Sequence, residues 1–122
     1  MTKILAVDDE PLYQHLLKVN LEKEGYDVIT ASNGEEALEM VSTRHPDLVI
    51  MDIMMPKMDG YSSCYALKRE AATRSIPIII LTAIDLKLNL ECGKEIGADG
   101  YITKPFNSQD LLDNIAQVLA TA

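Results

Sequence analysis

Short apolar runs alternate with longer segments of helical character along the whole chain, and this alternation constrains the fold most strongly. The expected strands are Lys3–Val7, Tyr26–Thr30, Leu48–Met51, Pro77–Leu81 and Asp99–Thr103. The expected helices are Pro11–Glu24, one capped by Ser32 or Asn33, Tyr61–Ala72, 85–96, and one opened by Asn107 or Ser108. Regular alternation of strand and helix predicts an α/β fold, in which a parallel sheet carries helices on both faces.

Two of these helices carry features of particular interest. In the first, Leu12, Leu16 and Val19 form one stripe at helical spacing, and Gly25 stands where a helix C-terminal glycine belongs. The segment 85–96 is less regular, because its leucines alternate and a glycine interrupts it. Those leucines either pack into the core or form an apolar patch for a dimer or partner.

Composition narrows the class of protein. The chain has 122 residues, of which 48% are apolar and 25% charged, so residues 1–122 are expected to form one globular domain. A net charge of −8 argues against direct nucleic-acid binding. No apolar run is long enough for a bilayer, and the first residues lack a signal-peptide pattern. Cys64 and Cys92 lack metal spacing, which favours free thiols and a cytoplasmic location.

One charged residue interrupts the apolar pattern in an informative place. Leu48–Met51 form an apolar run, and Asp52 follows at its end. A buried carboxylate without a partner is costly, so this position predicts a compensating charge or a functional role.

Other polar side chains fall at the expected carboxyl ends of strands, the edge where ligands bind in such sheets. They are Asp8, Asp9, Glu10, Asp52, Thr82 and Lys104. Converging carboxylates repel one another, and an all-oxygen ligand set suits Mg²⁺. A carboxylate can act as a nucleophile and form an acyl phosphate, so the set predicts a magnesium-dependent phosphoryl-transfer site with Asp52 as the nucleophile.

The motifs VDDEP (Val7–Pro11), DIMMPKMDG (Asp52–Gly60), LTA (Leu81–Ala83) and GADGYITKPF (Gly97–Phe106) occur in this order. Together they make the chain resemble the receiver domains of bacterial two-component response regulators, including the chemotaxis regulators. The resemblance implies a doubly wound, flavodoxin-like (βα)5 sandwich with a five-stranded parallel sheet of order 2-1-3-4-5. It also implies a cytoplasmic phosphoprotein of a signalling phosphorelay, which catalyses only its own phosphorylation and slow autodephosphorylation.

The resemblance assigns a role to each site residue. Asp52 would accept a phosphoryl group from a sensor histidine kinase or a phosphotransfer protein. Asp9, Asp52 and the backbone carbonyl of Met54 would bind Mg²⁺ directly, and Asp8 would act through water. Lys104 would contact the phosphoryl oxygens.

Further roles concern the output of the domain. Thr82 would also contact the phosphoryl group and form a conformational switch with Tyr101, and the Lys104–Pro105 peptide would be cis. The face of the fourth helix, fifth strand and fifth helix would meet a downstream effector or output domain, or form a homodimer. Met54 and Ile84, two residues beyond Asp52 and Thr82, cannot orient a water, which predicts slow self-dephosphorylation.

Three alternatives remain open at this point. An Asp-nucleophile phosphatase generally needs a second acid two residues after the first, where this chain has Met54. A flavodoxin-like cofactor binder needs a phosphate loop free of carboxylates, unlike Asp8–Glu10. A degenerate receiver that signals without phosphate would lack acceptor-site residues, and all of them are present.

Overall fold

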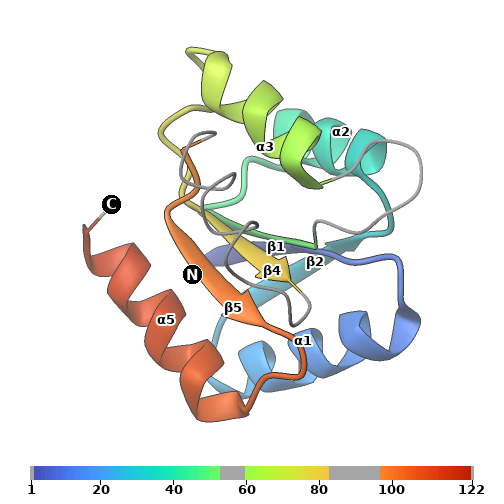
Figure 1. Ribbon diagram of the computed structural model, residues 1–122, viewed down its shortest axis with the longest axis vertical. Coiled ribbons are helices and arrows are strands. Elements are labelled where there is room, and N and C mark those ends of the chain that lie inside the picture. Colours follow the sequence, from blue (N-terminus) through green and yellow to red (C-terminus); the bar gives the residue numbers. More distant parts are fainter. Residues whose placement is uncertain (1, 53–59, 83–96, 122) are drawn as a thin grey trace.

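The computed structural model describes residues 2–52, 60–82 and 97–121, with backbone alone for 60–62 and 82. Its elements in chain order are β1 (Lys3–Val7), α1 (Pro11–Lys23), β2 (Asp27–Ala31), α2 (Gly34–Arg44), β3 (Leu48–Asp52), α3 (Gly60–Arg69), β4 (Ile78–Thr82), β5 (Gly100–Thr103) and α5 (Ser108–Thr121). All strand pairs are parallel, and the strand order is β2-β1-β3-β4-β5. The expected fold class and strand order are confirmed (Figure 1).

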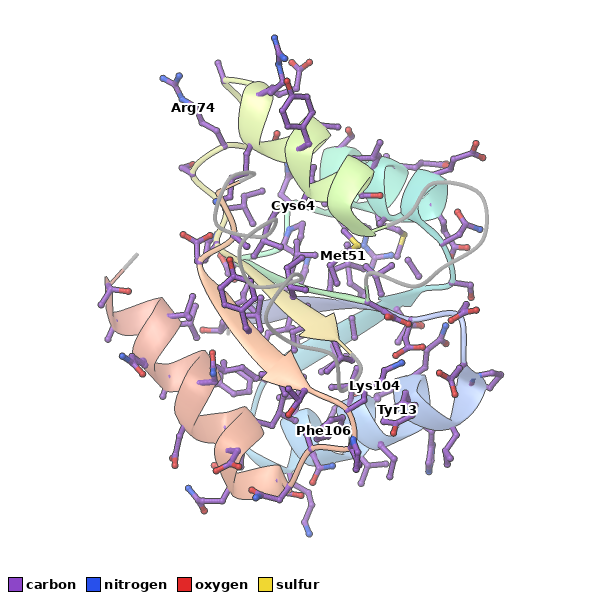
Figure 2. The ribbon with its side chains drawn as sticks, viewed as in Figure 1. Tyr13, Met51, Cys64, Arg74, Lys104 and Phe106 are labelled. Atoms are coloured by element: carbon purple, nitrogen blue, oxygen red, sulfur yellow. The ribbon has the colours of Figure 1, made fainter. Side chains whose placement is uncertain are left out.

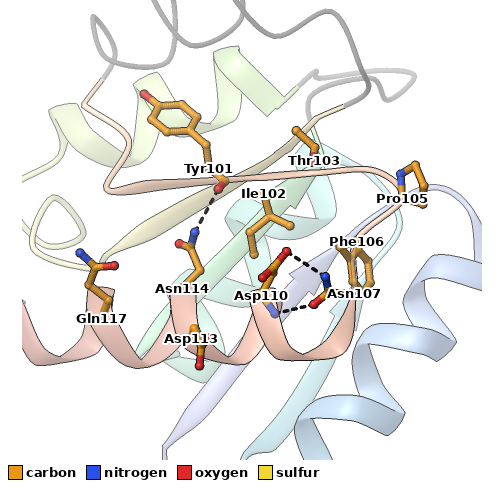
Figure 3. A pocket seen from close by; sticks show the side chains of 10 residues that line it. All are labelled: Tyr101, Ile102, Thr103, Pro105, Phe106, Asn107, Asp110, Asp113, Asn114 and Gln117. Carbon is orange, nitrogen blue, oxygen red and sulfur yellow. Dashed lines mark hydrogen bonds between the residues drawn. The ribbon is translucent and has the colours of Figure 1, made fainter.

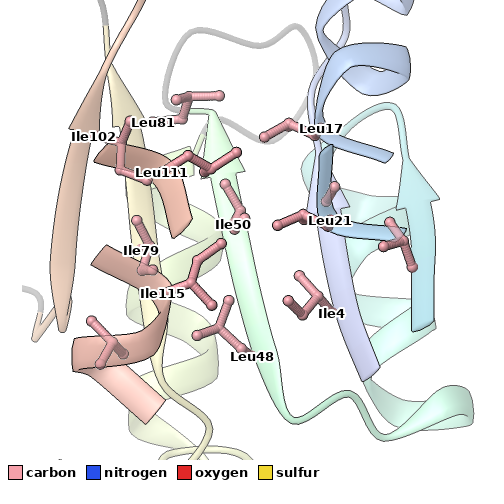
Figure 4. Close-up of a cluster of buried hydrophobic side chains, with 13 residues drawn as sticks. Ile4, Leu17, Leu21, Leu48, Ile50, Ile79, Leu81, Ile102, Leu111 and Ile115 are labelled. Carbon is pink, nitrogen blue, oxygen red and sulfur yellow. The ribbon is translucent and has the colours of Figure 1, made fainter. Parts of the chain in front are cut away.

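Helices cover both faces of the sheet (Figure 1). On one face, α1 and α5 place Leu17, Leu21, Leu111 and Ile115 against the sheet, within one buried apolar cluster (Figure 4). On the other face, α2 and α3 contribute to a second cluster that includes Val41. All five residues of β3 are buried, because this central strand has a helical layer on each side.

The helix ends follow local capping chemistry. Asn33, rather than Ser32, caps α2, because its side chain accepts a hydrogen bond from the backbone N–H of Glu36. Asn107 does the same for Asp110 at the start of α5. Gly25 follows α1 with a φ of 90°, the left-handed conformation that glycine adopts most readily. The ends of the strands differ from the expected ends by no more than one residue. The strands β3 and β4 each extend to a polar residue, Asp52 and Thr82.

The apolar stripe expected in α1 does not face the core. Leu12, Leu16 and Val19 are 64%, 38% and 42% exposed, whereas Leu17 and Leu21 are fully buried. The face of α1 that carries Leu17 and Leu21 packs against the sheet, because both leucines belong to the buried cluster that contains residues of β1 and β3. The helix expected at 85–96 lies outside the described residues. Among the helices that are described, none is both long and apolar enough to cross a bilayer.

Gly100, the first residue of β5, lies so close to α5 that a side chain would not fit there without a shift. A Cβ at this position would lie 2.8 Å from Asn114 Oδ1 and 3.1 Å from Val118 Cγ2, both on α5. Asn114 cannot simply turn away, because its Nδ2 donates a hydrogen bond to the Tyr101 carbonyl. The absence of a side chain therefore lets α5 approach β5 closely.

We expect Gly100→Ala to lower the free energy of unfolding by about 1–3 kcal/mol, the usual cost of overpacking a well-packed site. Urea denaturation of the wild-type chain and the variant measures this change. In the Asn114→Ala background the added methyl group has more room, so the same substitution should cost less. An equal cost in both backgrounds would contradict the contact with Asn114.

Candidate functional site

The sheet register brings three functional side chains to one edge. β1 and β3 pair with Val7 opposite Met51, so Asp8 and Asp52 follow at the same level. Asp8 is 0% exposed and Asp52 is 2% exposed. β5 ends at Thr103, and Lys104 follows on the same edge. The carboxyl ends of parallel strands therefore place two buried carboxylates and one ammonium together, as the sequence predicted.

Lys104 connects the acidic residues. Its Nζ lies 2.8 Å from Asp8 Oδ2, 3.1 Å from Asp52 Oδ2 and 3.2 Å from Glu10 Oε1. Burial alone would lower the pKa of this ammonium, but the carboxylates of Asp8 and Asp52 outweigh it and raise the pKa above its ordinary value. Lys104 is thus a permanently charged partner for the two buried acids.

One ammonium does not balance the acidic cluster. Asp8, Asp9, Glu10 and Asp52 each place a carboxylate oxygen within 4.8 Å of the others. Asp8 Oδ2 is buried, and among the described residues it has no hydrogen-bond donor beyond its ion pair with Lys104. Hard oxygen ligands with excess negative charge are the donor set that Mg²⁺ takes in proteins. The cluster therefore fits the expected Mg²⁺ ion.

The structure describes some of the other expected site residues. Thr82 ends β4, and its backbone lies opposite Thr103 of β5. Its side chain and all of Met54 lie outside the described residues. The Tyr101 hydroxyl is buried and has no hydrogen-bond partner within the part of the chain that the structure describes. Burial, and then the nearby Cys64 and Asp99, raise its pKa. Cys64 is a buried free thiol whose pKa burial raises to about 11. The Lys104–Pro105 peptide is cis, as expected.

Gln14 is a site residue that sequence reasoning missed. Its Nε2 lies 2.5 Å from the carbonyl oxygen of Asp8, 3.3 Å from that of Ala31 and 3.1 Å from Ser32 Oγ. The amide thus joins the ends of β1 and β2. A polar residue in the first turns of a helix that follows a functional strand is the signal that could have indicated this role.

Glu10 and Tyr13 are two further neighbours of Lys104. Figure 2 shows Tyr13 beside Lys104. Glu10 precedes α1 and is 56% exposed in its side chain, whereas the Tyr13 ring is half-buried. The sequence placed Glu10 at the correct edge without giving it a role. No pattern pointed to Tyr13, because its contact with Lys104 spans most of the chain.

A separate cleft of about 420 Å³ lies between β5 and α5 (Figure 3). Tyr101, Phe106 and Asn114 are among the residues that line it, and the Asn114 side chain reaches the Tyr101 carbonyl across it. Neither Asp52 nor Lys104 lines this cleft, so it is distinct from the acidic site.

Comparison with known proteins agrees with this geometry. The family model described as "Response regulator receiver domain" matches residues 4–116. This chain belongs to that family. It is a receiver domain of two-component response regulators, a signalling domain whose general role in the family is to accept a phosphoryl group, and receiver domains bind Mg²⁺ at an acidic pocket.

Two curated relatives are nearly half identical to this receiver domain over the aligned residues. The alkaline phosphatase synthesis transcriptional regulatory protein PhoP of Bacillus subtilis is 46% identical over 117 residues, which cover 96% of this chain and 48% of that protein. The probable transcriptional regulator ycf27 of Porphyra purpurea is 48% identical over 120 residues, which cover 98% and 48%. The receiver domain thus spans about half the length of the curated relatives it matches.

Solved structures have the same fold. A putative response regulator from Chloroflexus aurantiacus superposes with a TM-score of 0.94 at 35% identity, covering 98% of both chains. The chemotaxis protein CheY4 of Vibrio cholerae gives a TM-score of 0.92 at 35% identity, covering 97% of this chain and 98% of that one. A signal receiver domain of a histidine kinase from Syntrophus aciditrophicus gives 0.92 at 38% identity, covering 100% and 92%.

Proposed function

We propose that Asp52 is the phosphoacceptor of this receiver domain, which comprises residues 1–122. The observation that supports this most directly is a 2%-exposed carboxylate whose Oδ2 lies 3.1 Å from the Lys104 ammonium, inside a cluster of further acids. A structural carboxylate would need one partner. This one has a cation and an excess of negative charge around it, which is the arrangement that a phosphoryl-transfer site requires.

The transfer forms one bond and breaks one. An Asp52 carboxylate oxygen forms a bond to phosphorus, while the bond from phosphorus to the donor breaks. The donor is a phosphohistidine nitrogen or the acyl oxygen of a small phosphodonor, and it keeps the electron pair. Asp52 reacts as the carboxylate, so the nucleophile loses no proton.

Charge neutralisation comes from two sources. Lys104, already 3.1 Å from Asp52 Oδ2, contacts the oxygens of the transferred group together with Thr82. Asp9, Asp52 and the carbonyl of Met54 would hold Mg²⁺ directly, with Asp8 acting through water. The bound ion would supply Lewis-acid stabilisation of the phosphoryl oxygens. Catalysis by the domain is limited to its own phosphorylation and to a slow loss of the phosphate, because neither Met54 nor Ile84 can orient a water.

Signal output follows from the phosphorylated site. Thr82 and Tyr101 form the switch: Thr82 ends β4 at the site edge, and Tyr101 lies in β5, the strand that Lys104 follows. The upstream partner is a sensor histidine kinase or a phosphotransfer protein. The downstream partner is an effector or an output domain, or a second copy that meets the face of the fourth helix, β5 and α5.

The wild-type domain should gain one phosphoryl group from acetyl phosphate in Mg²⁺ and none in EDTA, because the acidic cluster needs the cation to accept more negative charge. Intact mass spectrometry measures both arms. The folded chain without any mass gain in Mg²⁺ would overturn the proposal. Continuous release of phosphate from an added phosphomonoester would instead favour an Asp-nucleophile phosphatase. Such an enzyme generally needs a second acid two residues after the first, and this chain has Met54 there.

A further inference from the structure

The Lys104 ammonium lies over the face of an aromatic ring. Its Nζ is 4.2 Å from the centroid of Tyr13, within the range of a cation–π contact. The Lys104 side chain is only 11% exposed, and such contacts are stronger where the cation has lost most of its water. Figure 2 shows Tyr13, Lys104 and Phe106 beside one another.

The same ring also supports the loop that carries Lys104. The centroids of Tyr13 and Phe106 are 5.9 Å apart, with their planes inclined at 51°. Lys104 and Phe106 flank Pro105, so Tyr13 contacts the loop after β5 on both sides of that proline. Tyr13 itself is fixed in α1, which begins only two residues earlier.

A ring differs from the other partners of Lys104 in a way that matters for phosphoryl transfer. The carboxylates of Asp8, Asp52 and Glu10 compete for this ammonium. Asp52 is also a proposed Mg²⁺ ligand, and Asp8 would act on the ion through water. A tyrosine ring carries no charge and does not bind Mg²⁺. It can hold the ammonium in place without competing with phosphoryl oxygens for its hydrogen bonds.

We propose that Tyr13 is a positioning residue for phosphoryl transfer, which holds the Lys104 ammonium beside Asp52 through the face of its ring. This inference rests on the proposed function of Asp52 and Lys104. It concerns a contact between α1 and the loop after β5, and it needs the ring of Tyr13 but not its hydroxyl.

The first test uses the magnesium-free protein and needs no reaction. The ε-protons of Lys104, assigned by their loss in Lys104→Met, should be shifted upfield by the ring current of Tyr13 in the NMR spectrum. The shift should persist in Tyr13→Phe and disappear in Tyr13→Leu. An identical Lys104 signal in wild type and Tyr13→Leu would overturn the contact.

The second test measures the rate of phosphorylation by acetyl phosphate in Mg²⁺. Tyr13→Phe should react within about twofold of wild type and Tyr13→Leu about fivefold to tenfold more slowly, the effect expected from one desolvated cation–π contact. The matched control is Tyr65→Leu. This ring is 47% exposed on α3, and its cation is Arg69, which lies 5.0 Å from the ring centroid. This variant should react at the wild-type rate.

Fluorination of the ring at position 13 distinguishes the packing of this ring from its electrostatic attraction for the Lys104 ammonium. Phenylalanine with one, two or three fluorine atoms at position 13 keeps its shape while its ring face becomes less negative. The rate should fall with each added fluorine at an unchanged thermal midpoint. If the wild-type domain is phosphorylated but the phosphorylation rate is the same in all the fluorinated variants, the positioning role of Tyr13 is wrong. The proposed function of Asp52 would then still hold. Failure of the wild-type domain to gain phosphate would instead contradict the proposed function.

Discussion

Asp52→Asn will gain no phosphoryl group from acetyl phosphate under conditions in which the wild-type receiver domain gains one. The amide has nearly the same shape as the carboxylate and can still accept a hydrogen bond from Lys104, which lies 3.1 Å away. It lacks the negative charge of the nucleophile, so the new bond to phosphorus does not form. Intact mass spectrometry of both proteins gives the result directly.

The fold should survive this change. Asp52 is buried in the central strand, and removal of its charge lessens repulsion within a cluster of four carboxylates. We therefore expect a thermal midpoint no lower than that of the wild-type domain. Asp27→Asn is the matched control, because it makes the same change at an exposed position of β2 and should leave the mass gain intact. Phosphorylation of Asp52→Asn at the wild-type level would place the acceptor elsewhere.

Lys104→Met should lower the free energy of unfolding by about 3 kcal/mol in magnesium-free buffer, the order of magnitude found when a buried ion pair loses one partner. The reason is that Asp8 and Asp52, 0% and 2% exposed, would then lack their cation. Mg²⁺ supplies a replacement charge, so millimolar Mg²⁺ should restore most of the loss. Urea denaturation with and without Mg²⁺ measures both effects.

Lys18→Met is the matched control for the loss of a lysine. Lys18→Met removes an exposed lysine from α1 and should change the free energy of unfolding by less than about 0.5 kcal/mol. Lys104→Met should also be phosphorylated more slowly, since its ammonium no longer meets the phosphoryl oxygens. A stability loss of the same size in both buffers would show that the carboxylates around Lys104 do not share a cation site.

The sequence was sufficient to predict the sheet and the edge at which its chemistry gathers. Five short apolar runs predict five parallel strands, and parallel strands bring their carboxyl ends together. The proximity of Asp8, Asp52 and Lys104 therefore follows from the sequence pattern, and the structure confirms it. The order of the strands required the resemblance to a family. Periodicity alone does not decide which strand lies at the centre of the sheet.

Contacts made by α1 could not be predicted in the same way. Leu12 and Leu16 have the same helical spacing as Leu17 and Leu21, and only the packing of α1 on the sheet buries the second pair. The roles of Gln14 and Tyr13 depend on β2 and on the loop after β5, which are distant in sequence. Such residues carry no motif, because their partners are chosen by the tertiary fold.

The amide of Gln14 couples the position of α1 to the backbone beside the acidic site. Its Nε2 donates hydrogen bonds to the carbonyls of Asp8 and Ala31, at the ends of β1 and β2. The carbonyl of Ala31 also accepts a hydrogen bond from the backbone N–H of Asp8. A displacement of α1 would break these bonds, so movement of this helix and movement of the backbone at Asp8 are linked.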